Sequence, residues 1–364
     1  MHPPLAAANT KVDMSLADFK QFDAYDLVFR NSKGKVRPNP ELPEGAPIAD
    51  THCHLGMLSD APLSIARAAH HGVRFIECIT DPSEHEEGEL VSTSVYESIE
   101  PWRVKAVEHL AELGSPVAQA PRIRMACGVH PHNARLWDQA KPQLLALLEN
   151  PLTSCIGEIG LDYHYDLSPR DVQREVFAEQ LRIAHETGLP VELHIREAHD
   201  EAVEILKREG VPEAGCVLHC FNLGSDDARP FVELGCYIAF GGPLTFKKEY
   251  ETRASLALIP SNRLLTETDA PYMAPEPARG VVCEPAHTAY TLRMLLDCMG
   301  YVGEERALEL MSPRPKDVLE GETPKPPLVP DFLAMQSGAG ELEMVQRIFG
   351  NAVALLDRPN PIAR

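Results

Sequence analysis

Short apolar runs alternate with amphipathic stretches along most of the chain, starting near residue 47. Eight of these runs have the length and the continuous hydrophobicity of strands that are buried on both faces. The expected strands are Ile48–Asp50, Val73–Ile79, Ile123–Val129, Ser154–Gly157, Pro190–Leu193, Cys216–Leu218, Cys236–Phe240 and Arg263–Thr266.

Segments with helical periodicity lie between several of these runs. The clearest is Pro169–Thr187, in which apolar residues recur at helical spacing. Ser168 is the expected N-cap of this helix, and Gly188 is the expected stop at its C-terminus. Further helices are expected at Glu197–Glu209, Asp226–Leu234 and His287–Met299.

Eight buried strands that alternate with helices are typical of a (β/α)8 TIM barrel, which usually takes about 250 residues. An open doubly wound sheet shows the same alternation, but it often carries a glycine-rich phosphate loop after its first strand. This chain has His52-Cys53-His54-Leu55 at that position. We therefore expect an α/β protein with the TIM-barrel fold.

The barrel is expected to occupy residues 47–311, with a further segment on either side. Residues 1–46 form an N-terminal extension, in which Leu16–Phe29 is amphipathic and suits a short helix. Residues 312–364 comprise a proline-rich insertion and a closing helix, Leu342–Leu356, that is expected to pack on the barrel. Within the barrel, the acidic stretch Asp81–Glu100 is expected to be a solvated loop.

The composition is that of a globular protein, with 44% hydrophobic and 24% charged residues among 364. No run approaches the roughly 20 apolar residues that a membrane helix needs, and no signal peptide is recognisable at the N-terminus. The nine cysteines are scattered singly, without zinc-site spacing. A cytoplasmic protein without a membrane partner is the expectation, and the oligomeric state is left open.

The formal net charge of −20 limits the partners that the chain can bind. Such a charge repels polyanions at long range, which argues against tight, non-specific binding of duplex DNA through a broad basic face. Bound metal ions can nevertheless reverse the charge of a pocket. An anionic substrate must therefore be held by a small, concentrated positive site.

Polar residues with metal-binding chemistry follow several of the expected strands. His52 and His54 end the first strand, and residues two apart in a strand point to the same side. This pair alone is a weak signal, but four further candidates stand at other strand ends. They are Glu158, His194, His219 and Asp269.

The active sites of barrel enzymes are assembled at the carboxyl ends of several strands. Four histidines and two carboxylates there would be costly to bury without a shared cation. Together they form the usual ligand set for a pair of divalent ions of the zinc or manganese type. The sequence therefore predicts a metal site in the barrel mouth, with Mn or Zn as the candidate ions.

Seven segments of the sequence, in this order, resemble the motifs of the TatD family of metal-dependent hydrolases, a group of amidohydrolase-type barrels. They are Asp50–Leu55, Gly128–His132, Gly157–Tyr163, His194–Ala198, His219–Phe221, Gly241–Lys247 and Leu265–Tyr272. The resemblance covers about residues 47–311.

The resemblance adds Mg to the candidate ions and implies how the ligands are divided. His52, His54 and Asp269 would hold one ion, His194 and His219 would hold the other, and Glu158 would bridge the two. Two such ions lower the pKa of a water molecule and stabilise charge on phosphoryl oxygens, and Asp269 is the expected general base. Two ions, two carboxylates and a hydroxide leave a net charge of about +1 at the site.

The implied activity is a TatD-like phosphodiesterase or deoxyribonuclease. His130 is expected to contact the substrate phosphate or the leaving group, with support of neighbouring side chains as the alternative. Arg196 is expected to contact a phosphate, with a salt bridge to nearby acids as the alternative. His132 is expected to be structural.

The expected nucleic-acid substrate is a DNA end or a short single strand, because few phosphates can be neutralised outside the metal site. Lys247, Lys248 and Arg279 are candidates for the remaining contacts. The alternative function is hydrolysis at a carbon centre: of an amide, a lactone or an aminoacyl ester such as a D-aminoacyl-tRNA.

Overall fold

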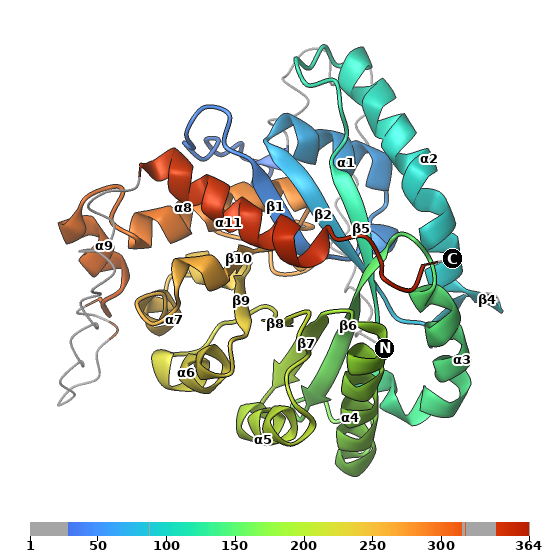
Figure 1. Cartoon of the computed structure of the whole chain (residues 1–364). Helices are drawn as coiled ribbons and strands as arrows, with labels where there is room; N and C mark the ends of the chain where they lie inside the picture. The colour runs from blue at the N-terminus through green and yellow to red at the C-terminus, as the bar shows by residue number, and fades with distance from the viewer. Residues whose placement is uncertain (1–27, 87, 315–316, 318–339, 364) are drawn as a thin grey trace.

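The computed structural model describes residues 28–86, 88–314, 317 and 340–363. Eight parallel strands form one sheet, in which each strand pairs with its neighbours in chain order (Figure 1). The strands are β1 (Ile48–Cys53), β2 (Val73–Thr80), β5 (Arg122–Cys127), β6 (Thr153–Asp162), β7 (Val191–Arg196), β8 (Cys216–Leu218), β9 (Tyr237–Phe240) and β10 (Leu264–Thr266).

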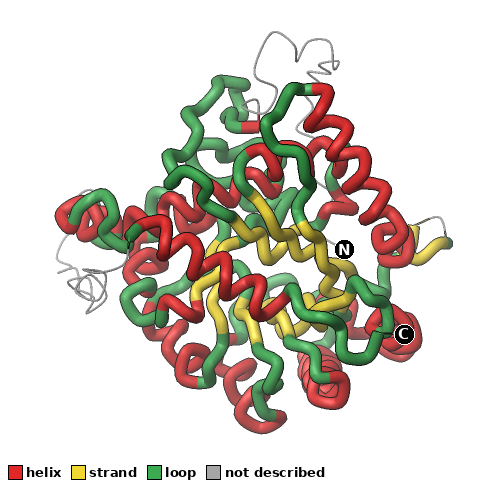
Figure 2. The backbone as a smooth tube through the Cα atoms, turned by 45° about the horizontal axis from the view of Figure 1, so that its top comes forward, coloured by secondary structure: helices red, strands yellow, loops and turns green. Residues whose placement is uncertain are grey.

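The sheet curls into a barrel, and its two outer strands meet through a few specific contacts. The Thr266 hydroxyl donates to the backbone carbonyl of Ala49 over 2.8 Å, and an isolated parallel bridge joins Cys53 to Ala270 beyond the end of β10. The helices surround this barrel (Figure 2). The fold is therefore the expected (β/α)8 TIM barrel, and all eight expected strands are present.

Each of the four expected helices within the barrel is present. The described helices are α1 (Ala61–His70), α2 (Val91–Glu112), α3 (Trp137–Leu148), α4 (Arg170–Thr187), α5 (His199–Glu209), α6 (Ser225–Glu233), α7 (Tyr250–Ser255), α8 (Thr288–Cys298), α9 (Glu304–Leu310) and α11 (Glu341–Leu356).

The N-cap of α4 differs from the expectation. Pro169 is the N-cap, and the Ser168 hydroxyl instead donates to the carbonyl of His132 and accepts from the backbone N–H of Arg135. Ser168 thus connects this loop to the loop that follows β5. Gly188 ends α4 in the left-handed conformation, with φ 70°, as expected.

The prediction of a solvated loop at Asp81–Glu100 is wrong. A short hairpin, β3 (His85–Glu86) and β4 (Glu89–Leu90), is followed by the first turns of α2. Acidic residues dominate the composition of this stretch, but Val95 and Ile99 recur at helical spacing and are buried in the core. The apolar face of the helix, rather than the net charge, decides the structure.

The described parts of the two flanking segments pack against the barrel. Val28 and Phe29 are buried beside α8, where His287 Nε2 lies 3.0 Å from the carbonyl oxygen of Val28. Most of the expected helix Leu16–Phe29 and most of the insertion at 312–343 lie outside the described residues. The division of the chain near residues 47 and 311 stays a prediction.

The closing helix α11 confirms the expected helix at Leu342–Leu356. Leu355 and Leu356 pack against inward-facing residues such as Phe75 and Val217, and Asn351 donates to the carbonyl of Leu264 at the start of β10. The helix therefore covers the amino-terminal end of the barrel. This leaves the carboxyl-terminal end for the site. None of the described helices is long and apolar enough to cross a membrane.

Candidate metal centre

Glu158, near the middle of β6, stands at the centre of a cluster of imidazoles. Its Oε1 atom lies 2.9 Å from His219 Nε2 and 2.5 Å from His194 Nδ1. Its Oε2 atom lies 3.6 Å from His52 Nε2. The two oxygens of one buried carboxylate thus face histidines from opposite parts of the barrel: β1 on one side, and β7 and the end of β8 on the other.

His54 and Asp269 complete the group on the β1 side. His54 Nε2 is 3.3 Å from His52 Nε2, and Asp269 Oδ1 is 3.6 Å from His54 Nε2 and 3.8 Å from His52 Nε2. The backbone N–H of Asp269 donates to the carbonyl of His52 over 2.9 Å, which ties the loop after β10 to β1. The structure therefore brings all six expected ligands together in one cluster.

The donor atoms of this cluster suit divalent ions. Ligand atoms of His52, His54 and Glu158 lie within 4.8 Å of one another, and so do those of His130, Glu158 and His194. Imidazole nitrogens and carboxylate oxygens are the ligands that zinc and manganese prefer, and burial makes them costly to leave without a cation. The residues present therefore fit a metal centre.

The charges of the cluster are strongly coupled. Burial alone would raise the pKa of Glu158, but the imidazoles of His219, His130 and His194 outweigh it and hold that pKa well below its usual value. Burial lowers the pKa of His52 well below the usual value. At His219, the negative charges of Glu158 and Glu267 outweigh burial and raise the pKa well above the usual value. Without metal, the imidazoles thus favour the ionised form of Glu158, and Glu158 in turn favours the protonated form of His219.

His130 lies at the edge of this cluster, just before the short helix η4 (Pro131–Leu136). Its Nδ1 accepts the backbone N–H of His132 over 3.1 Å, so the neutral ring carries its proton on Nε2, which is 3.6 Å from Glu158 Oε1. Burial lowers the pKa of His130 to about 3. His130 therefore presents a neutral N–H donor to the site.

Asp162, at the end of β6, was not singled out by the sequence. Its Oδ2 atom lies 2.8 Å from His132 Nε2 and 3.1 Å from His194 Nε2. The Nε2 proton of His194 is directed at this carboxylate, which leaves Nδ1 to face Glu158. His132 belongs to the same network and so lies behind the cluster rather than in it.

Arg196, at the end of β7, lies outside the cluster. Its guanidinium stacks on the ring of Tyr165, 4.8 Å from the ring centroid, and it forms no ion pair with any residue that the structure describes. The salt-bridge alternative to its expected phosphate contact is therefore not observed among those residues.

Two more carboxylates that sequence reasoning missed lie deeper in the barrel. Glu192 precedes His194 by two residues on β7, and Glu267 precedes Asp269 by two. Both side chains are completely buried, and burial raises the pKa of each. For Glu192 the two-residue period of a strand was the available signal, because it places Glu192 on the same face of β7 as His194.

A pocket opens above the cluster, with His54, His130 and Glu158 in its wall. Apolar side chains from the loop after β1 and from α2 line another part, including Met57 and Val95. Two acids from the segment after β2, Asp81 and Glu84, also line it. Asp81 accepts the backbone N–H of His130 over 3.1 Å, which connects it to the loop after β5. The pocket gives a substrate access to the histidine cluster.

A parallel barrel with a cluster of histidines and carboxylates at the carboxyl ends of its strands is the architecture of a metal-dependent hydrolase. Comparison with known proteins specifies the family. The model of TatD-related DNases matches residues 49–311. The chain is 34% identical over 238 residues to an uncharacterised metal-dependent hydrolase, YabD, of Bacillus subtilis, covering 62% of this chain and 93% of the relative.

A second relative, the 3'-5' ssDNA/RNA exonuclease TatD of Cronobacter turicensis, is 41% identical over 150 residues, which cover 41% of this chain and 57% of the relative. Among solved structures, the TatD homologue YjjV of Escherichia coli K12 superposes with a TM-score of 0.61 at 27% identity, over 86% of this chain and all of YjjV. The chain thus belongs to the TatD family of metal-dependent hydrolases, which confirms the resemblance.

Proposed function

We propose that the protein is a phosphodiesterase that hydrolyses nucleic-acid ends or short single strands with the help of two divalent ions. The observation that carries the proposal is the position of Glu158, whose two carboxylate oxygens face separate groups of imidazoles. His52, His54 and Asp269 would hold one ion, His194 and His219 the other, and Glu158 both. Such ions supply a hydroxide nucleophile near neutral pH and stabilise negative charge on phosphoryl oxygens.

Three side chains of this chain act on the substrate in the proposal. Asp269 takes the proton of the attacking water, because its carboxylate lies beside His52 and His54 and remains partly exposed. His130 donates its Nε2 proton to a phosphoryl or leaving-group oxygen. Arg196 contacts the phosphate with a guanidinium that pairs with no described carboxylate and stacks on Tyr165.

Two further features support a nucleic-acid substrate. The relative from Cronobacter turicensis is named as an exonuclease of single-stranded DNA and RNA, and it shares 41% identity over the matched residues. On this chain, Lys247 and Lys248 are exposed near the loop after β9. The Arg279 guanidinium lies 3.8 Å from the centroid of the Phe246 ring. These cations would contact only a few phosphates, which suits a strand end better than a continuous duplex.

Hydrolysis at a carbon centre is the second candidate. The observation in its favour is the pair of acids in the pocket, because Asp81 and Glu84 lie where a polyanion would have to enter. A neutral amide, lactone or aminoacyl ester would not be repelled there. The chemistry that divalent ions supply serves phosphorus and carbon centres equally.

The two candidates are separated by assaying one preparation on several substrates in parallel. Zinc- or manganese-loaded protein is tested on a labelled single-stranded oligonucleotide, a chromogenic phosphodiester and a panel of esters and lactones. The D269N variant is the matched control for contaminating nucleases. We expect the oligonucleotide and the phosphodiester to be cleaved and D269N to be inactive on both. Turnover of the carbon esters alone would overturn the proposal, and so would equal activity of D269N.

A further inference from the structure

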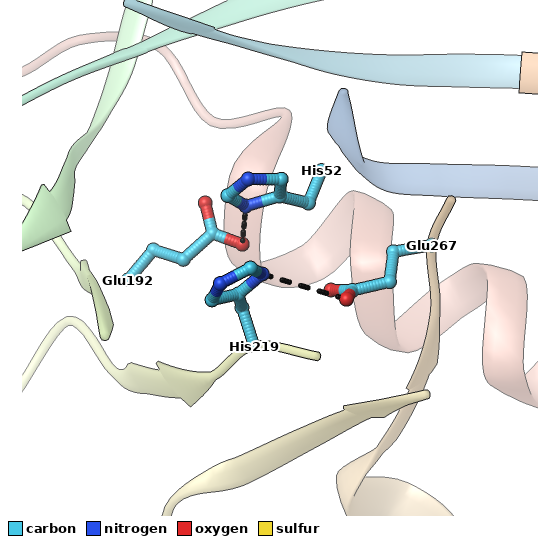
Figure 3. A group of neighbouring side chains, drawn as sticks. All are labelled: His52, Glu192, His219 and Glu267. Atoms are coloured by element: carbon cyan, nitrogen blue, oxygen red, sulfur yellow. Dashed lines mark ion pairs between the residues drawn. The ribbon is translucent and has the colours of Figure 1, made fainter. Parts of the chain in front are cut away.

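Two imidazoles of the centre, His52 and His219, each have a buried glutamate behind them. Glu192 Oε1 lies 3.1 Å from His52 Nδ1, and Glu267 Oε1 lies 3.5 Å from His219 Nδ1. The two rings are stacked, with centroids 3.9 Å apart, and the glutamates approach them from β7 and from the segment after β10 (Figure 3). Neither glutamate pairs with a lysine or arginine of the described chain.

The other nitrogen of each ring points to the opposite side. His52 Nε2 and His219 Nε2 both face Glu158, at 3.6 Å and 2.9 Å from its oxygens. A neutral imidazole has one nitrogen that donates a proton and one with a free electron pair, and only the latter can bind a metal ion. Which nitrogen carries the proton therefore decides whether the electron pair points toward the centre.

We propose that Glu192 and Glu267 are positioning residues that hold the protons of His52 and His219 on Nδ1 and so aim both Nε2 electron pairs at the metal centre. The inference rests on the metal-dependent function proposed above. In the structure both contacts lie at ion-pair distance, and neither Nδ1 atom has a hydrogen-bond partner among the described residues. In the proposal, each carboxylate accepts the Nδ1 proton of its histidine when metal binds, fixes the ring against rotation and increases the basicity of Nε2. Glu267 is itself held in place, because it accepts the backbone N–H of Cys220 over 2.7 Å.

The local backbone makes room for this arrangement. A Cβ atom at Gly157, which precedes Glu158, would lie only 2.7 Å from the Cβ of Glu192. A Cβ atom at Gly241 would lie 3.4 Å from Glu267 Oε1. Glycine at these two positions therefore lets the backbone approach the buried glutamates closely.

The alternative occupant of this space is a third cation, since ligand atoms of His52, Glu192, His219 and Glu267 lie within 4.8 Å of one another. That arrangement would need both imidazoles to lose their remaining proton and to bridge two ions each. Hydrogen bonds to the carboxylates require no such deprotonation. The geometry therefore favours a role of the glutamates in positioning the histidines over a third metal site. The number of ions bound per chain distinguishes the two roles.

The test measures zinc affinity in three variants of the full chain. Metal-free wild type, E192Q, E267Q and E77Q are titrated with Zn2+ in competition with a chromogenic chelator. Glu77 is the matched control because it is an equally buried glutamate on β2, but it accepts from the Ser154 hydroxyl over 2.8 Å rather than from an imidazole. We expect two ions per wild-type chain and an unchanged affinity in E77Q.

The two test variants are expected to weaken the binding of different ions. E192Q acts through His52 and should weaken one binding step by about 10- to 100-fold, whereas E267Q acts through His219 and should weaken the other by a similar factor. Activity lost at limiting zinc should return at saturating zinc, because neither glutamate touches the substrate. Unchanged affinity in both variants would overturn the proposal. A third wild-type ion that E192Q removes would also overturn it.

A second measurement needs no variant and so does not depend on whether a variant folds. Long-range 1H–15N correlation spectra of the zinc-loaded wild type, labelled at histidine, report directly which ring nitrogen carries the proton. We expect Nδ1–H for His52 and His219, and Nε2–H on either ring would contradict the inference. Zinc binding with these tautomers but without phosphodiester hydrolysis would leave the inference intact and refute the proposed function.

Discussion

The proposed role of His130 as a neutral donor can be tested with two substitutions that resemble different parts of the imidazole ring. In H130N, the amide oxygen takes the place of Nδ1 and can still accept the N–H of His132, but nothing reaches the position of Nε2. In H130Q, the amide nitrogen reaches toward the Nε2 position and the acceptor is lost. The pair therefore separates donation into the site from support of the loop after β5.

The magnitude follows from the kind of hydrogen bond that is removed. A neutral donor to a charged oxygen contributes about 1.5–3 kcal/mol. With 1.36 kcal/mol for each factor of ten in rate, H130N should lower kcat by about 10- to 150-fold if the bond forms mainly in the transition state. H130Q should retain more activity than H130N, because it keeps a donor.

The assay is steady-state turnover of a chromogenic phosphodiester, together with metal content by mass spectrometry. Because burial lowers the pKa of His130 to about 3, the ring stays neutral across the assay range. The ratio of wild-type to H130N activity should therefore be constant between roughly pH 5 and 9. Loss of a bound ion in H130N would refute the donor role and identify His130 as a metal ligand. A ratio that changes near neutral pH would show that His130 transfers a proton.

Three further outcomes are expected. Burial raises the pKa of Glu77 above its ordinary 4.5, so the folded chain keeps a proton that the unfolded chain releases. Above pH 4.5, the free energy of unfolding therefore falls by up to about 1.4 kcal/mol per pH unit. E77Q should therefore raise Tm relative to wild type, more at pH 8 than at pH 5. Asp357 pairs with Arg122 over 2.6 Å and with Arg124 over 2.9 Å. In urea unfolding, D357N should lower the free energy of unfolding by about 1–3 kcal/mol. This range is set low because Arg122 is largely exposed. If few phosphates are contacted, KM for a labelled single strand should rise only weakly with salt, with a logarithmic slope of about +0.7 per phosphate, and a steep slope would indicate an extended basic groove.

The order of strands was readable from the sequence because strands buried on both faces are continuous apolar runs. Where polar residues enter the interior, the expected boundaries were too short: β6 extends through Glu158 to Asp162, and β7 extends through His194 to Arg196. A metal ligand interrupts an apolar run without interrupting the strand. The hydrophobic pattern therefore marks the apolar part of a strand, although β6 stays buried through Asp162.

The prediction for the acidic stretch after β2 failed for the opposite reason. Its seven acids suggested a solvated loop, yet the acids at Glu97 and Glu100 occupy only the outer face of α2. The apolar positions between them are buried against the barrel, and that burial determines the helix. Composition averages over the two faces of a helix, whereas periodicity separates them.

The cluster of six expected ligands could be predicted because each residue follows an apolar run and carries a recognisable side chain. The carboxylates behind the histidines could not be assigned in the same way. Glu192, Glu267 and Asp162 lie within or next to strands, and a single glutamate there is consistent with many roles until the imidazole nitrogen opposite it is known. Side-chain contacts across the barrel are a property of the closed structure.

These buried carboxylates change how the centre attracts a phosphate. The six ligands, two ions and a hydroxide give about +1, but Glu192 and Glu267, when ionised, bring the site to about −1. A net positive charge is then not what holds an anionic substrate in a chain with a formal charge of −20. In the proposed function, binding depends instead on directed contacts: electron pairs of the substrate toward the ions, the Nε2 proton of His130 and the guanidinium of Arg196, which pairs with no described carboxylate. The same charge balance predicts that E192Q and E267Q lower KM at saturating zinc while they weaken zinc binding. Each substitution removes one negative charge behind the centre.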